Sequence, residues 1–418
     1  MTTLAPDELP AEAAGHPSAP LWRTPGLTVL FAASTTARLA NECGRLGLVL
    51  LALDRTGSPA LSGALVAAAT FPQLVSGPLL GAWLDRTPHR RTVFVAHQLL
   101  LAAVLTWLVL AVGHAPSWLL VLTAALPGGT APVLTGGYTG LIAPLVPRPL
   151  MQRAYGAEAT SYNVAGVGGP ALAGAVAAWG SPSAAVLVAA GLALLALVPL
   201  ARVPMPAPAP PHGDHLLRAV AAGLRHMAVT PPLRAATVAT TLSYGGMGAL
   251  PVVLPALAHE LGAPAAAGGA LFSTFAVGAL LSSVSLAARA PRTGPLRLAF
   301  LGVLGVGAAA CGLAVVPTLW LAFLVVGVAG VFESPVVAST LTVRDRHSPP
   351  SMRTQVVTTA ASIKIGAFAL GSGAAGAVVA AHGARAGAWL LAGCQGAGLL
   401  LGALSLGRAT RRTGQRLR

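Results

Sequence analysis

The sequence predicts an all-α integral membrane protein with twelve transmembrane helices in two pseudo-symmetric six-helix bundles. Hydrophobic residues make up 55% of its 418 positions, charged residues make up only 9%, and the mean hydropathy is +0.74. A soluble protein carries about 25% charged residues, so this chain could not cover a surface exposed to water. Its apolar runs repeatedly exceed the roughly 18 residues expected of a membrane helix. Because these runs are continuous rather than alternating, they argue against an outer-membrane barrel.

The apolar runs define the expected helices, and the segments between them define the expected domains. The runs cover residues 26–52, 57–84, 92–112, 117–146, 154–178, 182–201, 233–257, 264–288, 296–315, 318–343, 354–381 and 385–407. Prolines at 127, 132 and 144 predict kinks in the fourth helix, and Pro335 predicts one in the tenth. We expect a disordered cytoplasmic tail at 1–25, helix bundles at 26–201 and 233–407, a cytoplasmic linker at 202–232 and a basic cytoplasmic tail at 408–418.

The distribution of basic residues predicts the orientation of the chain. Of the 26 Lys and Arg, 21 lie in the two tails and in the connectors 85–91, 147–153, 202–234, 289–297 and 344–353. The connectors on the other side hold only Arg55 and Arg385. Because basic residues favour the cytoplasmic side, we expect a multi-pass protein of the inner (plasma) membrane with both termini in the cytoplasm. Charge scattered between apolar runs also argues against nucleic acid as a partner.

The linker at 202–232 contains a segment with helical periodicity. Its apolar positions are Leu217, Val220, Leu224 and Met227, and Arg218 and Arg225 fall on another face. This pattern predicts either an amphipathic helix on the inner membrane surface or a plain linker helix. A weak internal repeat, "AGAV" at 173–176 and 375–378, supports two related halves on either side of this linker, a plan common among transporters.

Charge is concentrated in the connector between the second and third helices, within "GPLLGAWLDRTPHRR" at 77–91. Gly77, Gly81 and Asp85 are spaced four residues apart, so they share one helix face. Small residues at this spacing let another helix approach closely. An aspartate on the same face can accept hydrogen bonds from the N-terminus of a neighbouring helix or pair with arginine.

This connector resembles the signature of the major facilitator superfamily, Gly-x-x-x-Asp-Arg-x-Gly-Arg-Arg. The matching residues are Gly81, Asp85, Arg86 and Arg90, followed by Arg91, whereas Pro88 and His89 replace the usual Gly and Arg. The resemblance implies the major facilitator fold and a conformational latch between the two halves. The corresponding connector after the eighth helix, "SLAARAPRTGPLR", has no aspartate.

The fifth predicted helix resembles a second motif, that of the drug/proton antiporter group, Gly-x8-Gly-x3-Gly-Pro-x2-Gly-Gly. The chain has Gly156, Ala165, Gly169, Pro170, Ala173 and Gly174 at those positions. The preceding "LVPRPLMQRAYGAEA" is similar to the macrolide-efflux and enterobactin-exporter branch. Small residues pack helices together, and the resemblance adds the implication of antiport.

Ionisable residues inside membrane helices are costly and usually functional. The first helix carries Arg38, Glu42 and Arg45 on one stripe, and the tenth and eleventh carry Glu333 and Lys364. One interpretation is a polar cavity that binds substrate and protons. The other is a structural ion-pair network, in which Arg38 and Glu42 satisfy each other at i, i+4.

Among the carboxylates, Glu333 is the better candidate for a proton carrier, unless Lys364 pairs with it. Glu42 is flanked by two arginines, and Glu158 could pair with Arg153 or with the latch arginines. Another set of polar residues could face the cavity or hydrogen-bond within the helix packing: Asn41, Gln73, His97, Tyr138, Asn163, Ser243 and Tyr244.

The resemblance implies a secondary active exporter that exchanges protons for a small organic molecule, such as a drug, antibiotic, siderophore or metabolite, by alternating access. We expect a monomer in the lipid bilayer, with no cofactor, no bound metal and no enzymatic activity. The sole lysine lies in "SIKIG", so the chain has no phosphate-binding loop, and it has no His-Glu-x-x-His motif. An importer or symporter on the same fold, a membrane-embedded enzyme and a non-transporting membrane protein are the alternatives.

Overall fold

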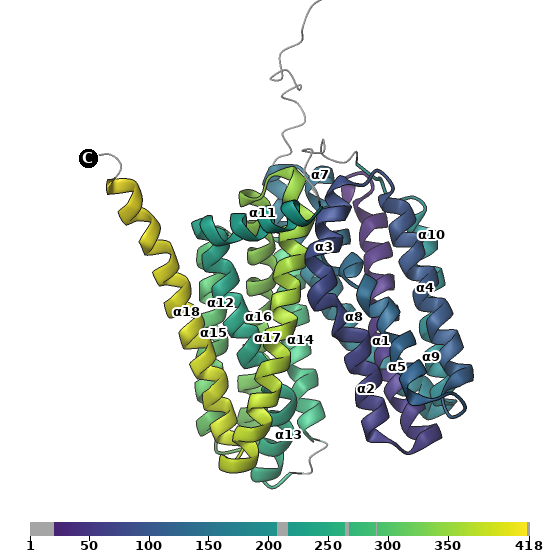
Figure 1. The fold of residues 1–418 in the computed structure, drawn as a ribbon. Coiled ribbons are helices and arrows are strands. Elements are labelled where there is room, and N and C mark those ends of the chain that lie inside the picture. The colour runs from purple at the N-terminus through teal and green to yellow at the C-terminus, as the bar shows by residue number, and fades with distance from the viewer. Residues whose placement is uncertain (1–20, 207–215, 264–266, 290, 416–418) are drawn as a thin grey trace, which may run out of the picture.

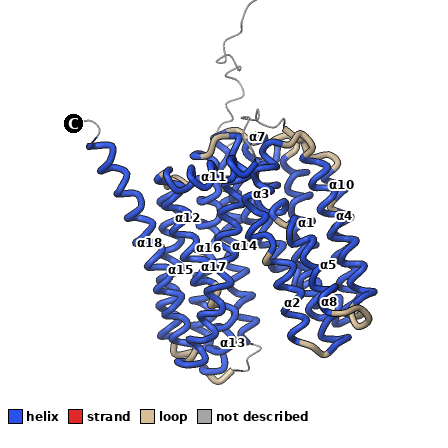
Figure 2. Tube along the Cα trace, viewed as in Figure 1, coloured by secondary structure: helices blue, strands red, loops and turns tan. Residues whose placement is uncertain are grey.

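A computed structural model describes residues 21–206, 216–263, 267–289 and 291–415 of the chain. Within these ranges the regular structure is entirely helical, without a strand (Figure 2). The predicted fold class is therefore confirmed. Residues 1–20 of the predicted N-terminal tail and 207–215 of the predicted linker lie outside the described residues.

The first half of the chain contains six predicted spans, and the second, fourth and sixth of these are interrupted by short breaks (Figure 1). Its helices are α1 (Leu27–Thr56), α2 (Pro59–Thr70), α3 (Pro72–Arg86), α4 (Arg90–Ala111), α5 (Ser117–Thr130), α6 (Tyr138–Gly140), α7 (Ile142–Leu145), α8 (Met151–Trp179), α9 (Pro182–Leu195) and α10 (Leu197–Leu200). Short 3₁₀ turns, η2 (Leu21–Arg23) and η4 (Arg148–Leu150), precede α1 and α8. Ser58 and Ser181 cap α2 and α9, each followed by a proline at the first helical position.

The second half begins after the linker helix α11 (Leu216–Val229). Its helices are α12 (Pro231–Met247), α13 (Leu250–Glu260), α14 (Ala267–Ala288), α15 (Pro295–Val315), α16 (Leu319–His347), α17 (Arg353–His382) and α18 (Ala384–Gln415), with a 3₁₀ turn η5 (Pro350–Met352) before α17. Helix α18 continues past residue 407, where the basic tail was expected to begin.

Ten helical segments in the described part of the chain are long and apolar enough to cross a membrane. The helices α1 and α8 are outside this set, although they fill the first and fifth predicted spans. These two helices carry Arg38, Glu42, Arg45 and Glu158. All four of these charged side chains belong to the site described below.

The fourth predicted span is the most irregular. Helix α5 ends at Thr130, a π-helical turn η3 (Val133–Gly137) follows Pro132, and α6 and α7 complete the span. Of the prolines expected to kink their helices, Pro132 lies at this break. Pro127 and Pro335 lie inside the continuous helices α5 and α16, and Pro144 lies inside the short helix α7. A π-turn leaves backbone carbonyls without their usual helical partners, so side chains can reach them.

The two halves meet along two seams. Helix α3 packs against α17, and α8 packs against α14, so in each case the second span of one half contacts the fifth span of the other.

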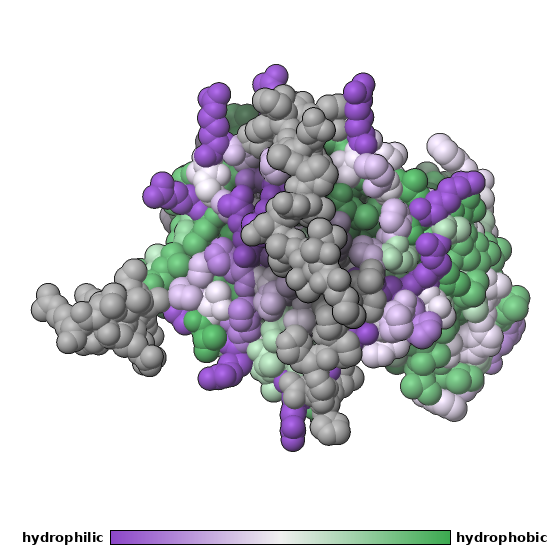
Figure 3. All heavy atoms as spheres, turned by 90° about the horizontal axis from the view of Figure 1, so that it is seen from above, coloured by the Kyte–Doolittle hydropathy of each residue, from purple (hydrophilic) through white to green (hydrophobic). Residues whose placement is uncertain are grey.

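We call the end of the molecule with the α3–α4 connector the connector end. It lies at the top of Figure 1, together with α11, whereas α13 lies at the opposite end, which we call the far end. Figure 3 views the connector end, where hydrophilic side chains are spread over the surface and hydrophobic ones lie along the flanks.

The linker helix α11 lies against α3 and α17 at the connector end. Its protein-facing residues are Ala219, Gly223 and Met227, whereas Leu217 and Leu224 are exposed. The apolar stripe expected from the sequence is therefore divided, because only Met227 of that stripe is buried against the protein.

Candidate functional site

Two adjoining cavities lie among the helices that carry the charged residues. The first, of ≈ 440 Å³, is lined by Arg38, Asn41, Glu42, Arg45 and Gln73 and by apolar residues from both halves. The second, of ≈ 240 Å³, is lined by Asn163, Tyr244, Glu333, Arg344 and Lys364, again with apolar residues from both halves. Thr135, Tyr162 and Ile365 line both cavities, so the two adjoin.

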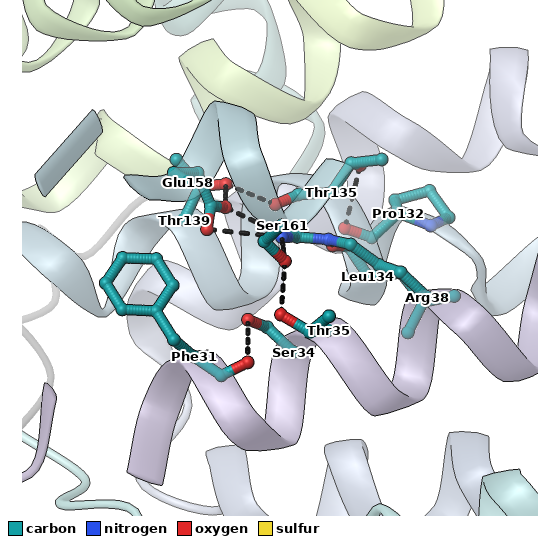
Figure 4. Close-up of polar contacts among 10 residues, drawn as sticks. All are labelled: Phe31, Ser34, Thr35, Arg38, Pro132, Leu134, Thr135, Thr139, Glu158 and Ser161. Atoms are coloured by element: carbon teal, nitrogen blue, oxygen red, sulfur yellow. Dashed lines mark hydrogen bonds and ion pairs between the residues drawn. The ribbon is translucent and has the colours of Figure 1, made fainter. Parts of the chain in front are cut away.

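Arg38 is the most extensively bonded charged residue at the first cavity (Figure 4). It forms a bidentate ion pair with Glu158 of α8, with Nη2–Oε1 at 2.6 Å and Nη1–Oε2 at 3.2 Å. Its Nη1 also donates to Ser161 Oγ at 2.7 Å, and its Nε donates to the carbonyl oxygen of Leu134 at 2.9 Å. The guanidinium lies 3.8 Å from the centre of the Tyr162 ring. Arg38 therefore ties α1 to α8 and to the π-turn η3.

The pairing of Arg38 with Glu42, one of the two interpretations of this stripe, is wrong, although Arg38 does belong to an ion pair between helices. Glu42 instead pairs with Arg45, three residues away, at 3.2 Å, and both side chains are partly exposed to the first cavity. The reason is that Arg38 turns toward α8, where Glu158 is buried and also accepts a hydrogen bond from Thr139. Spacing along one helix could not reveal a partner on another.

The expected pairing of Glu158 with Arg153 or with the arginines of the connector is wrong for the same reason. Arg153 donates to the carbonyl oxygen of Ala287 at 3.1 Å, across the α8–α14 seam. Glu158 lies more than a helical turn deeper on α8, within reach of Arg38.

Glu333 of α16 lies in the second cavity and has a hydroxyl as its hydrogen-bond donor. Its side chain is 8% exposed, and the Tyr244 hydroxyl donates to Oε1 at 3.0 Å. Lys364 Nζ lies 4.3 Å from the centre of the Tyr244 ring, a cation–π arrangement. The two candidates from the sequence, Glu333 and Lys364, are thus brought together around one tyrosine.

Arg344 is a cavity residue that the sequence analysis missed. It was assigned to a cytoplasmic connector at 344–353, but α16 continues to His347 and buries Arg344, which is only 2% exposed, at the second cavity. The sequence contains a signal for this extension, because the first helix breaker after the tenth span is Pro349. The next residue, Asp345, pairs with Arg353 at 2.8 Å.

The additional polar residues divide into two groups. Asn41 and Gln73 line the first cavity, and Asn163 and Tyr244 line the second. The others are used in helix packing: His97 Nδ1 is 2.7 Å from Thr130 Oγ1, Tyr138 packs against Phe94, and the Ser243 carbonyl accepts from Gln395. Among the described residues, no group of three His, Cys, Asp or Glu side chains is arranged to hold a metal ion.

Asp85 joins the two halves at the connector end. Its Oδ1 accepts a hydrogen bond from the backbone N–H of Thr354 at 3.0 Å, and its Oδ2 accepts one from Gln355 at 3.0 Å. These N–H groups belong to the first turn of α17, where the helix dipole favours a negative charge. The carboxylate is 1% exposed, so water does not compete for these bonds.

The glycines before Asp85 allow this contact. A Cβ atom at Gly77 would lie 2.0 Å from Ser362 Oγ, and one at Gly81 would lie 2.6 Å from the Cα of Gln355. At Gly81 the clash is with backbone, so a larger side chain would move α17, whereas at Gly77 it would displace the Ser362 hydroxyl from its hydrogen bond to the carbonyl oxygen of Gln73. The two glycines therefore set the close approach of α3 and α17.

The arginines after Asp85 have different neighbours. Arg90 Nε donates to the carbonyl oxygen of Leu84 at 2.8 Å, which satisfies the C-terminal end of α3. Arg91 donates to the carbonyls of Leu200, Ala201 and Val203, which end the sixth span. Arg86 is half-buried.

The residues of the fifth-span motif lie in α8 and act in helix packing. A Cβ atom at Gly156 would lie 2.6 Å from the backbone nitrogen of Ala287 in α14, and one at Gly169 would lie 2.8 Å from that of Cys43 in α1. Ala165 is buried, Pro170 lies within the continuous helix, and Gly174 has open space beside it.

Comparisons with known proteins identify the family of this fold. The family model described as Major Facilitator Superfamily matches residues 30–240 and 236–416. A protein from Sinorhizobium fredii (strain NBRC 101917 / NGR234), named "Uncharacterized MFS-type transporter y4rN", is 29% identical over 372 residues, covering 86% of this chain and 90% of the relative.

Solved structures show the same fold at low sequence identity. The human organic anion transporter MFSD10 (TETRAN) matches with a TM-score of 0.74 and 19% identity, over 90% of this chain and 98% of that one. A variant of the E. coli fucose:proton symporter FucP has a TM-score of 0.73 and 13% identity, over 91% of this chain and 98% of that one. A bacterial homologue of the iron transporter ferroportin in an outward-facing state has a TM-score of 0.73 and 17% identity, over 92% of this chain and 99% of that one. With the family model matching almost the whole length of both bundles, the chain belongs to the Major Facilitator Superfamily.

Proposed function

We propose that this membrane transporter is a proton-coupled exporter of a small organic molecule and works by alternating access. The observation that carries the proposal is that the contact closing the connector end lies apart from the charged cavities. Asp85 binds the N-terminus of α17 at the connector end, whereas Gln73, which lines the first cavity, lies about 18 Å away along α3. Opening the connector end while the far end closes, and the reverse, would expose the cavities to each membrane face in turn.

The proposed orientation places the connector end in the cytoplasm, together with both termini. It is supported by exposed basic residues at that end: Arg218 and Arg225 in α11, Arg292 between α14 and α15, and Arg346 in the last turn of α16. The exporter direction, and membership of the drug/proton antiporter group, are supported by the near match of Gly156, Gly169 and Pro170 to that group's motif. We propose a monomer in the plasma membrane.

We propose Glu333 as the proton carrier. Glu158 and Glu42 both pair with arginines, whereas the hydrogen-bond donor to Glu333 is the neutral hydroxyl of Tyr244. A buried carboxylate that lines a cavity between two helix bundles can exchange its proton with either side as access alternates.

The test is transport by the purified chain in proteoliposomes with an imposed proton gradient, using a panel of antibiotics, siderophores and small organic acids. We expect substrate to move against the direction of proton flow. Movement in the same direction would identify an importer or symporter instead. Transport that is unchanged when the gradient is dissipated would exclude proton coupling.

The assignment of Glu333 has its own test. Glu333→Gln is expected to abolish gradient-driven transport while leaving equilibrium binding of substrate largely intact. The matched control is Glu260→Gln, which neutralises a partly exposed carboxylate at the far end of the molecule. Normal coupling in Glu333→Gln would rule out this residue as the carrier.

A further inference from the structure

The charges at the two cavities differ in how they are balanced. At the first cavity, Arg38 pairs with Glu158 and Arg45 pairs with Glu42. At the second cavity, the cations Arg344 and Lys364 face the single carboxylate of Glu333 among the lining residues. The second cavity therefore carries an excess positive charge when all three groups are ionised.

Arg344 is a buried cation with unsatisfied donor atoms among the described residues. Its side chain is 2% exposed, and its Nε and Nη2 atoms are buried with no hydrogen-bond partner among the described residues. Its neighbour Asp345 is engaged by Arg353 at 2.8 Å and does not compensate it. A buried charge without partners is strongly destabilising, so its presence beside a cavity points to a ligand that supplies them.

The unpartnered atoms have a defined geometry. Nε and Nη2 donate in parallel from one edge of the guanidinium, the arrangement that binds the two oxygens of a carboxylate or phosphate. Lys364 supplies a second cation to the same cavity. Two other polar side chains of the lining already donate within the protein: the Tyr244 hydroxyl to Glu333, and the Asn163 amide to Ser334.

The rest of the lining is apolar. Val337, Leu341, Val357 and Ile365 line the second cavity beside Arg344. The cavity of ≈ 240 Å³ adjoins the first, of ≈ 440 Å³, so together they provide space typical of a site for a small organic ligand.

We propose that the second cavity binds a small organic anion. Its acidic group, a carboxylate, sulfonate or phosphate, accepts hydrogen bonds from Nε and Nη2 of Arg344, with Lys364 as the second cation, and its apolar body lies against Val337, Leu341 and Val357. This inference rests on the proposed transport function and names the chemical class of its substrate.

The test measures equilibrium binding, so it does not depend on transport or on a proton gradient. The full chain is purified in detergent and examined by equilibrium dialysis with 2-naphthoate, 2-naphthalenesulfonate and 2-naphthyl phosphate, which share one apolar body. Neutral 2-naphthamide is the ligand control. We expect at least one of the anions to bind at least tenfold more tightly than the amide, and the anion that does so identifies the acidic group.

The residue assignment is tested in the same assay. Arg344→Gln is expected to remove the preference for the anion, whereas Arg346→Gln, the same change at an exposed position two residues away, is expected to retain it. Arg344→Lys, which keeps the charge but loses the paired donors, is expected to lose at least tenfold in affinity. This variant decides the assignment if Arg344→Gln does not fold.

A lack of anion preference across the panel, or a wild-type preference in Arg344→Gln or Arg344→Lys, would overturn the proposal. Anion binding without proton-dependent transport would contradict the proposed function but leave the binding site in place. Proton-dependent export of neutral compounds without anion binding would support the proposed function but contradict the anion site.

Discussion

Arg38 of α1 and Glu158 of α8 form a bidentate ion pair, although 120 residues separate them in the chain. Both side chains are almost fully buried, at 4% and 1% exposed. The pair thus joins the first and fifth spans within one half of the molecule, at the wall of the first cavity. Its neighbour, Glu42 with Arg45, is partly exposed and joins no second helix.

We expect Arg38→Gln to destabilise the protein strongly, because it leaves the buried carboxylate of Glu158 without its partner. Breaking a buried ion pair by removing one partner costs ~3–5 kcal/mol. The control Arg45→Gln removes a partly exposed partner and is expected to cost less than about 1 kcal/mol. Thermal unfolding of the two variants in detergent measures the difference, and equal shifts would show that the Arg38–Glu158 pair is not structural.

We expect Asp85→Asn to slow transport by about tenfold, corresponding to ~1.4 kcal/mol, with little change in equilibrium affinity. The amide carries no charge to interact with the N-terminus of α17, so the closed connector end loses stability relative to the open one. Asp54→Asn, a neutralisation at an exposed position, is the control. Transport rates and binding constants are compared, and a selective loss of affinity would contradict a role as conformational latch.

We expect Gly81→Ala to open the connector end, because its Cβ would lie 2.6 Å from the Cα of Gln355. Spin labels at the exposed positions Pro88 and Pro349, in a background without native cysteines, would report a longer distance between the halves. Gly174→Ala adds the same methyl group to open space and serves as the control. An unchanged distance in Gly81→Ala would mean that α17 adjusts locally.

We expect Gly223→Leu to release the linker helix α11 from the connector end. A Cβ at Gly223 would lie 2.1 Å from Gln355 Nε2, and that amide nitrogen donates to the carbonyls of Ala219 and Val220. Hydrogen exchange of the α11 amides is expected to accelerate. The control is Ala221→Leu on the exposed side of the same helix, and the same acceleration in both variants would indicate a general loss of helicity.

The helices and their connectors could be predicted from the sequence because the bilayer imposes long apolar runs, broken where proline or charge appears. The partners of the polar side chains could not be predicted in this way. Arg38 and Glu42 have the spacing of a pair on one helix, but the partner of Arg38 lies on α8, and no periodicity links those two segments.

Arg344 was misplaced for a different reason. An arginine that follows an apolar run has the same local pattern whether it lies in a cytoplasmic connector or in one more helical turn facing a cavity. The position of Pro349 favours the extra helical turn, but that this turn faces a cavity follows only from the packing of α16 against α8 and α12.

The chemistry of the α3–α17 seam bears on how often it can be separated. Facing Gly77 and Gly81 are the hydroxyls of Ser362 and Thr358 and the backbone of Gln355, rather than interlocking large side chains. When the halves part, these surfaces can be wetted, because water replaces the hydrogen bonds that are lost. The seam therefore combines a tight seal with a low hydrophobic penalty for exposure, which suits the proposed contact that opens and re-forms in every turnover.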